Sequence, residues 1–343
     1  MQRKRAFLLI FVLVGVPIRS LSAYDAKTRG QRILVEESDT LFVMNPDGTD
    51  RHKVAENVTA AALSGDGNLV SYADHKGVYV FSLADDQSST VALLTEGSVD
   101  DLAWSPDQKH LAYDVGVPKK SLDLFLASYP PSGVAPRNLG HWYESISFSP
   151  NGKFIVHPAF DETNKHILET VNVETAKRET IYKATDTIWA ARYAPGGSSI
   201  AFTMAKTVPR THDDDEPECG GPNLDLWVLP LDSKQPVKIM EKAFAFDWSP
   251  DGRFLAIDRG TEDCGYPPGD SAVFISSLDQ KVQFQLSKDA PSMGAVFSPD
   301  SKYVMFIDSD GSHLVVGDVS TRKLSPLPRA STHGFTYLVY GWK

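Results

Sequence analysis

Short apolar stretches recur along the chain, and each is followed by a turn of small, polar or Pro residues and then by a second apolar stretch. Within them, apolar residues alternate with polar ones or run continuously, which is typical of β-strands. No segment keeps a helical period. The pattern therefore predicts an all-β protein built from hairpins. The stretches that follow the turns are Leu111–Tyr113, Phe154–Val156, Ile200–Phe202, Phe254–Ile257 and Tyr303–Ile307.

The turn between the two stretches is a motif that repeats six times. Pro presets φ for the first central position of a turn, and Asp, Asn and Gly tolerate the tight conformations that follow. Successive copies are 41, 44, 45, 55 and 49 residues apart, close to the roughly 40–50 residues of a propeller blade. We therefore expect a β-propeller. The copies are Leu63–Gly67, Trp104–Gln108, Phe148–Gly152, Tyr193–Gly197, Trp248–Gly252 and Phe297–Ser301.

Further strands complete each repeat, and the two ends of the chain supply one more blade. Third strands are expected at Val78–Phe81, Leu124–Leu126, Leu226–Leu229 and Val273–Ile275, and weaker fourth strands at segments such as Val91–Leu94 and Val237–Met240. The chain before the first turn supplies the second, third and fourth strands of a blade that lacks its first strand: Ile33–Val35, Leu41–Met44 and the segment around Val54. Near the C-terminus, Phe335–Tyr340 resembles a first strand without its turn. Placing this C-terminal strand in the incomplete N-terminal blade removes open sheet edges and predicts seven four-stranded blades. Six blades are the alternative.

These units resemble the WD40-like repeats of the TolB family, in which an aromatic residue precedes Ser-Pro-Asp-Gly and a strand similar to Leu-Ala-Phe follows. Trp104–Gln108 with Leu111–Tyr113 is one such copy, and the resemblance covers nearly all of residues 31–343. It implies the fold, since function depends on sites that differ among proteins of one fold. TolB also carries an N-terminal α/β domain, which we expect to be absent here, so its specific role is not implied.

The N-terminus predicts export. The basic residues Arg3–Arg5 precede the apolar run Ala6–Val16, and small residues follow up to Ser22 and Ala23, which is the order of a secretory signal peptide. The run is about half of the ~20 residues that a spanning helix needs, so a membrane anchor is the weaker alternative. We expect removal of residues 1–23 and a single propeller domain over 24–343, periplasmic or extracellular, with no stable membrane anchor.

Composition and charge are those of an ordinary globular protein, which we expect to be a monomer. Of 343 residues, 42% are hydrophobic and 23% charged, which is enough apolar content for a sizeable core. The formal net charge of −10 is spread along the chain. Nucleic acid is therefore not expected as a partner, because phosphate-backbone binding requires a basic surface.

The beginnings of the first strands are the expected binding site. In propellers these strands line the central channel, so residues five positions before each Ser should stand at its mouth. One arc of this rim is acidic or polar and the other aromatic or apolar, which would suit a peptide or amphipathic ligand with a cationic group. The alternative is that these side chains only pack against one another. They are Thr59, Asp100, Glu144, Trp189, Phe244 and Met293.

Two long loops between second and third strands, about 206–222 and 259–270, should lie side by side on the same face. Cys219 lies in one and Cys264 in the other, so an exported chain is expected to join them in a disulfide, with two free thiols as the alternative. Acidic residues in both loops are weak candidates for Ca²⁺, since their spacing matches no EF-hand and charge runs are usually solvated. These residues are Asp213, Asp214, Asp215, Glu262 and Asp263.

Catalysis has weaker support than binding. Histidines in or beside the loops between second and third strands are the remaining candidates for catalytic residues. The sequence contains no zinc-ligand spacing and no nucleophile elbow. We expect a non-enzymatic platform for a protein, peptide or glycan, with no cofactor other than a candidate Ca²⁺ and no catalytic residue. The alternative is a propeller hydrolase or lyase with a metal at the channel mouth. The histidines are His75, His166, His212 and His313.

Overall fold

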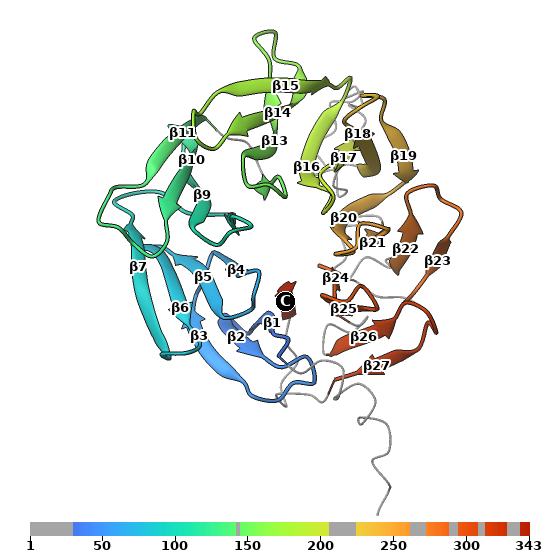
Figure 1. Ribbon diagram of the computed structural model, residues 1–343, viewed down its shortest axis with the longest axis horizontal. Helices are drawn as coiled ribbons and strands as arrows, with labels where there is room; N and C mark the ends of the chain where they lie inside the picture. Colours follow the sequence, from blue (N-terminus) through green and yellow to red (C-terminus); the bar gives the residue numbers. More distant parts are fainter. Residues whose placement is uncertain are drawn as a thin grey trace, which may run out of the picture.

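The computed structural model describes residues 30–141, 145–205, 224–260, 272–287, 294–307, 313–327 and 337–343. These residues form seven antiparallel sheets of four strands, arranged as blades around a central axis (Figure 1). The protein is thus an all-β, seven-bladed propeller, and the alternative of six blades was wrong. No helix in the described ranges is long and apolar enough to cross a membrane.

Blades 1 to 4 occupy the N-terminal half of the chain and take one strand from the C-terminus. Blade 1 contains β28 (Tyr337–Trp342), β1 (Ile33–Glu37), β2 (Thr40–Met44) and β3 (His52–Glu56). Blade 2 contains β4 (Ala60–Leu63), β5 (Leu69–Asp74), β6 (Gly77–Ser82) and β7 (Gln87–Leu93). Blade 3 contains β8 (Leu102–Trp104), β9 (His110–Val117), β10 (Ser121–Ser128) and β11 (Arg137–His141). Blade 4 contains β12 (Ser147–Phe148), β13 (Phe154–Phe160), β14 (His166–Asn172) and β15 (Arg178–Lys183).

Blades 5 to 7 complete the ring. Blade 5 contains β16 (Thr187–Tyr193), β17 (Ser199–Ala205), β18 (Leu224–Pro230) and β19 (Val237–Met240). Blade 6 contains β20 (Ala243–Trp248), β21 (Phe254–Arg259), β22 (Ala272–Ser277) and β23 (Gln283–Gln285). Blade 7 contains β24 (Val296–Phe297), β25 (Tyr303–Ile307), β26 (Leu314–Asp318) and β27 (Leu324–Pro326). First strands such as β4, β20 and β24 lie nearest the centre (Figure 1).

The ring closes by pairing the two ends of the chain. β28 runs antiparallel to β1, with Ile33 opposite Trp342 and Glu37 opposite Tyr337. The backbone groups of Arg32 and Lys343 extend the ladder by two reciprocal hydrogen bonds, 2.6 and 2.8 Å long. The C-terminal strand, which has no turn motif of its own, therefore supplies the missing first strand of blade 1. This confirms the closure of the ring expected from the sequence.

The repeated motif forms the turn between the first and second strands of a blade. In blade 3 the Ser105 hydroxyl donates to Asp107 at 2.7 Å and accepts from the backbone N–H of His110 at 2.9 Å. The same two bonds recur at the Ser residues of blades 2, 4, 6 and 7. These serines are buried and bonded to their own turn, so they are structural and not nucleophiles.

Glycine is used in this motif because the fourth turn position has positive φ. Gly67, Gly152, Gly197 and Gly252 adopt φ between 69° and 74° there. A Cβ on Gly152 would lie 3.6 Å from Pro106 of the preceding motif, so adjacent turns pack in sequence around one end of the ring.

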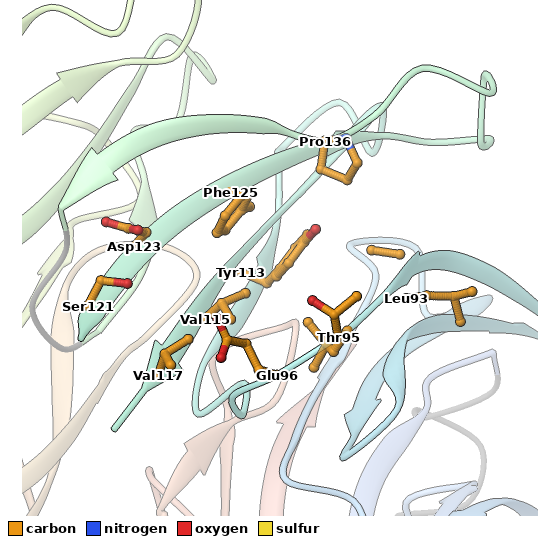
Figure 2. A pocket seen from close by; sticks show the side chains of 12 residues that line it. Leu93, Thr95, Glu96, Tyr113, Val115, Val117, Ser121, Asp123, Phe125 and Pro136 are labelled. Carbon is orange, nitrogen blue, oxygen red and sulfur yellow. The ribbon is translucent and has the colours of Figure 1, made fainter. Parts of the chain in front are cut away.

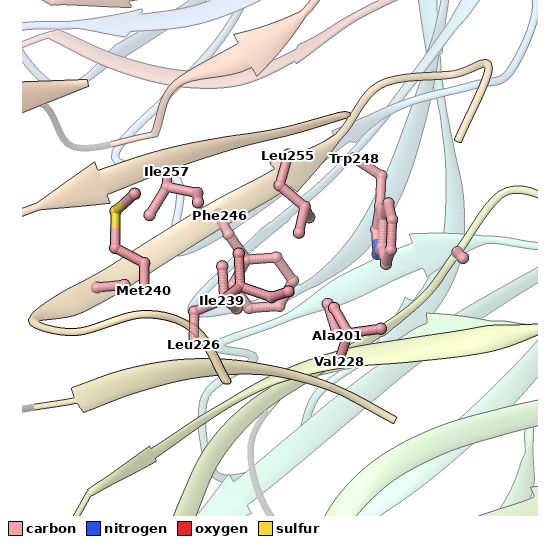
Figure 3. Close-up of a cluster of buried hydrophobic side chains, with 11 residues drawn as sticks. Ala201, Leu226, Val228, Ile239, Met240, Phe246, Trp248, Leu255 and Ile257 are labelled. Atoms are coloured by element: carbon pink, nitrogen blue, oxygen red, sulfur yellow. The ribbon is translucent and has the colours of Figure 1, made fainter. Parts of the chain in front are cut away.

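The hydrophobic core is divided among the interfaces between blades. Each of the seven interfaces holds one cluster of buried side chains, taken from the facing sheets of two neighbouring blades among the described residues. Between blades 5 and 6, Leu226 and Val228 pack with Phe246, Trp248 and Leu255 (Figure 3). A fully buried Leu or Ile contributes about 1.5–3 kcal/mol, so this packing between blades fixes the positions of the inner strands.

Candidate functional site at the channel

The residues predicted at the channel mouth occupy the beginnings of the inner strands. Thr59 directly precedes β4, Asp100 lies two residues before β8, Trp189 lies in β16 and Phe244 lies in β20. Asp100 is exposed, and the other three are partly buried. Glu144 and Met293 lie outside the described residues.

Trp189 and Phe244 each occupy a β-bulge. In β16, Ile188 pairs with Met204 and Ala190 with Thr203, so Trp189 is the extra residue between them. In β20 the bulge falls between Ala243 and Ala245, which leaves Phe244 in the equivalent place. Bulges redirect side chains and are frequent beside functional sites. Two neighbouring inner strands thus present an aromatic residue through the same backbone irregularity.

A second set of polar residues, on the inner strands or one to two positions before them, was not predicted from the sequence. Asp101 accepts a hydrogen bond from the N–H of Ile146 at 2.6 Å, and Asp247 accepts one from the N–H of Phe297 at 2.9 Å. Each bond joins the inner strand of one blade to that of the next. Ser145 and Ser147 of blade 4 make the same kind of bond to Ala191 and Tyr193 of blade 5.

These polar residues stand two or four positions before the Ser of their motif. Since side chains of a strand alternate between its faces, these positions share one face of the inner strand, directed toward the next inner strand. Asp101 and Asp247 remain partly accessible at the innermost strand of their blades, as expected for residues of the channel wall. Strand alternation within the repeats was the signal that could have identified them.

Arg192 brings a positive charge to this wall. Its guanidinium lies 3.6 Å from a carboxylate oxygen of Asp247, and 52% of the side chain is exposed. It is also close enough to Asp101 to favour the charged form of that carboxyl. Burial raises the pKa of Asp101, whereas the N–H of Ile146 and the charge of Arg192 oppose this rise. The contact with Asp247 is long and half-exposed, so a ligand can displace it at little cost.

Asp114 is a buried acidic residue in blade 3, beside the expected channel mouth. One carboxylate oxygen, Oδ1, accepts hydrogen bonds from the backbone N–H groups of Asp100 and Asp101 at 2.8 and 3.0 Å. Burial raises the pKa of Asp114 to about 6, and the charges of Asp101 and Asp100 act in the same direction. Perturbed acids are frequent at functional sites. Asp114 fixes the backbone that carries the mouth carboxylates.

Replacing Asp114 by Asn should stabilise the protein at neutral pH. Both hydrogen bonds end on Oδ1, which an Asn amide oxygen can replace, while the buried charge is removed. An acid whose folded pKa lies above its unfolded value costs stability as pH rises through the interval between them, here about 4 to about 6. We expect the free energy of unfolding of Asp114→Asn to exceed that of the wild type by about 1–3 kcal/mol at pH 8 and to equal it near pH 4. Urea unfolding at the two pH values measures this difference. An equal difference at both pH values would contradict this.

The structure describes three of the four candidate histidines and none of the five candidate metal ligands. His75 lies in the exposed turn between β5 and β6, His166 begins β14 with its ring 4.3 Å from that of Phe160, and His313 directly precedes β26. No group of three or more His, Cys, Asp or Glu residues in these ranges could hold a metal ion. Several other candidates lie outside the described residues: Cys219, Cys264, His212, Asp213, Asp214, Asp215, Glu262 and Asp263.

Comparison by sequence finds one family model that matches part of the chain. The family model described as "Eukaryotic translation initiation factor eIF2A" matches residues 54–215, which is less than half of the chain. These residues include blades 2 to 4 and the first two strands of blade 5. No curated protein matches the chain significantly. The matched residues thus fall on propeller repeats.

Comparison by structure identifies propellers. A putative TolB from Agrobacterium tumefaciens aligns with a TM-score of 0.53 and 16% identity over 75% of this chain and 88% of its own. TolB from Acinetobacter baumannii aligns with a TM-score of 0.51 and 13% identity over 94% and 86%. An oligogalacturonate lyase from Vibrio parahaemolyticus aligns with a TM-score of 0.60 and 14% identity over 88% and 86%. At these identities the likeness shows the fold alone, a propeller similar to those of the TolB structures.

Proposed function

We propose that this protein is an exported, non-enzymatic propeller that binds a segment of another protein or a peptide through its channel face, and that the segment carries a cationic group. The observation that supports this most directly is the pair of bulges that places Trp189 and Phe244 on neighbouring inner strands. Phe244 lies in the same strand as Asp247, three residues before it. Aromatic rings and carboxylates together attract cations.

The charge of the channel wall supports the same ligand. Asp100, Asp101 and Asp247 contribute carboxylates at or near the inner strands, whereas Arg192 is the cation that contacts one of them. A cationic ligand group can replace Arg192 beside Asp247 and leave the guanidinium available for a backbone carbonyl of the ligand. A neutral glycan could use the aromatic residues but not this charge pattern.

The signal peptide, export to the periplasm or the medium, and the disulfide are part of the same proposal. Cleavage after a signal peptide would release a monomer to the periplasm or the medium, where Cys219 and Cys264 would form a disulfide between two loops. Mass spectrometry of the unreduced, exported protein should find a mature N-terminus near Ser22 or Ala23 and a mass two hydrogens below that of the dithiol. Two free thiols would contradict the disulfide.

The binding proposal can be tested with random peptides displayed on phage. Peptides selected on the wild-type protein should carry Lys or Arg, and synthetic copies should bind Asp247→Asn about tenfold more weakly by calorimetry, which corresponds to about 1.4 kcal/mol. Trp189→Ala should weaken binding to a similar degree. Raising the ionic strength should weaken binding to the wild type, because salt screens accessible charges.

Glu179→Gln is the matched control, since it removes the same charge from an exposed position on the outer strand β15. It should leave affinity unchanged. Selected peptides without cations, or equal affinities of Asp247→Asn and Glu179→Gln, would contradict the proposal. A stoichiometric divalent ion that is lost in His166→Ala would instead favour the metal-dependent hydrolase or lyase.

A further inference from the structure

The outer strand of blade 2 differs from those of the other blades. Outer edges of sheets are commonly protected by charged residues, by Pro or by being short. β3, β11, β15 and β19 all contain Lys or Arg, β27 contains Pro, and β23 has only three residues. β7 is seven residues long, with the sequence Gln-Ser-Ser-Thr-Val-Ala-Leu, and carries neither charge nor Pro. Among the outer strands that the structure describes, β7 is the one with none of these three protections, although it contains a bulge at Val91.

This edge is also accessible. β7 is the last strand of its sheet and pairs only with β6 (Figure 1). Five of its seven residues are exposed. The N–H of Leu94 donates inward to the carbonyl of Lys76 at 2.8 Å. Since successive residues of a strand direct their backbone groups to opposite sides, Leu93 directs its N–H and C=O outward. These groups can pair with an added strand.

A cleft of about 330 Å³ lies at the C-terminal end of this edge, between blades 2 and 3. The side chain of Leu93 is 74% exposed beside it. Across the cleft lie Tyr113, Val115, Val117 and Phe125 (Figure 2). The cleft is also lined by Glu96, Ser121 and Asp123, but its far wall is mainly apolar. A large exposed apolar side chain beside such a wall is typical of an interaction surface. An added strand could place one apolar side chain there.

We propose that the β7 edge binds an extended segment of another protein, which adds a fifth strand to blade 2 and inserts an apolar side chain into the cleft. Strand addition of this kind takes affinity from backbone hydrogen bonds and specificity from pockets for side chains. The segment has an uncharged, β-branched centre, to match β7, and basic residues at its ends.

Charge complementarity argues for those basic ends. Exposed Asp85 and Asp86 directly precede β7, and exposed Glu96 follows it by three residues. Lys120 contacts Glu96 at 2.6 Å, but both side chains are more than half exposed, so this ion pair can be exchanged at little cost. A second copy of the chain fits less well, because antiparallel pairing of two β7 strands would bring the acidic ends together.

The test uses purified protein and a fluorescent peptide of alternating Thr and Val with Lys at both ends. Polarisation should show saturable binding, and the same peptide with Glu ends should bind at least tenfold more weakly. Thr90→Lys should weaken binding at least tenfold, because it places a charge on the edge. Leu93→Ser should weaken it through loss of the apolar contact. Hydrogen exchange should slow in residues 87–93 when the peptide binds.

Thr180→Lys is the matched control, since it makes the same substitution at an exposed position of the outer strand β15. It should leave binding unchanged. Binding of this cationic peptide at the channel would instead be weakened by Asp247→Asn and kept in Thr90→Lys, which separates this proposal from the one above. Absence of binding at 1 mM peptide, or equal effects of Thr90→Lys and Thr180→Lys, would overturn it. A dimer in sedimentation velocity that Thr90→Lys dissociates would also overturn it, in favour of self-pairing.

Discussion

Deletion of residues 332–343 should cause aggregation or lower the Tm by more than about 10 °C. The deletion removes β28, so β1 keeps β2 but loses its inner partner and becomes an open edge near the centre of the ring. It also removes Val339 and Trp342, which are 8% and 3% exposed in the cluster between blades 7 and 1. Losing such side chains costs about 3–5 kcal/mol for Trp alone, and each kcal/mol shifts the Tm by about 2–4 °C in domains of 150–250 residues. Thermal unfolding with light scattering measures both effects.

A synthetic peptide of residues 332–343 provides the control. Added in trans to the truncated protein, it should restore part of the lost Tm, and the Tm should rise with the logarithm of peptide concentration above its Kd, because a ligand of the native state stabilises by mass action. The Trp342→Ala variant of this peptide should restore less. A truncated protein that melts like the full-length one would show that β28 does not close the ring.

The blade count could be predicted from the sequence because the residues of the turn motif determine the conformation of the turn, so each copy marks one blade. The Pro and Gly positions fix backbone angles locally, so Trp248–Gly252 forms the same turn as Trp104–Gln108 although different loops surround them. Closure followed from the same logic, since Ile33–Val35 and Phe335–Tyr340 each lacked a partner. The structure pairs these segments as β1 and β28. Both inferences depended on local rules.

The site residues were harder to predict because they depend on irregularities and on contacts between blades. Counting five residues back from each Ser located Trp189 and Phe244, but not the bulges that make them extra residues in their strands. A bulge has no fixed sequence signature. Asp247 lies in β20 with Phe244, whereas Asp101 directly precedes β8 of blade 3. Their roles depend on N–H groups 50 and 45 residues away, respectively.

Arg178 illustrates a contact that no repeat pattern indicates. It lies at the start of β15 and donates to Glu169 at 2.6 Å within blade 4. It also donates to the carbonyls of Leu139 and His141 in blade 3, at 2.9 and 2.6 Å. Buried His157 contacts the same Glu169 oxygen at 3.2 Å. One side chain thus links the outer strands of two blades to a buried polar group.

Replacing Arg178 by Met should lower the free energy of unfolding by about 2–3 kcal/mol at pH 7, because removing one partner of a partly buried ion pair leaves the other without its counter-charge. Glu169 is only 15% exposed. Burial alone would raise the pKa of Glu169, but hydrogen bonds from His157 and Arg178 lower it below its ordinary value. Stability from a lowered acid pKa is present above the unfolded pKa and is lost as pH falls through the folded one. Urea unfolding at pH 7 and at pH 3 should therefore show a smaller difference between the variant and the wild type at pH 3.

Arg137→Met is the matched control, because Arg137 also links blades 3 and 4, through one exposed hydrogen bond of 2.6 Å to the carbonyl of Glu174. It should cost about 1 kcal/mol or less, as is usual for a single hydrogen bond. The double variant Glu169→Gln with Arg178→Met should be less destabilised than the sum of the two single variants, since each removes the same ion pair. If Arg178→Met cost no more than Arg137→Met, or if the two single effects simply added, the ion pair would not couple the two blades. Stability at this interface would then come from the apolar cluster around Leu124 and Ile155 alone.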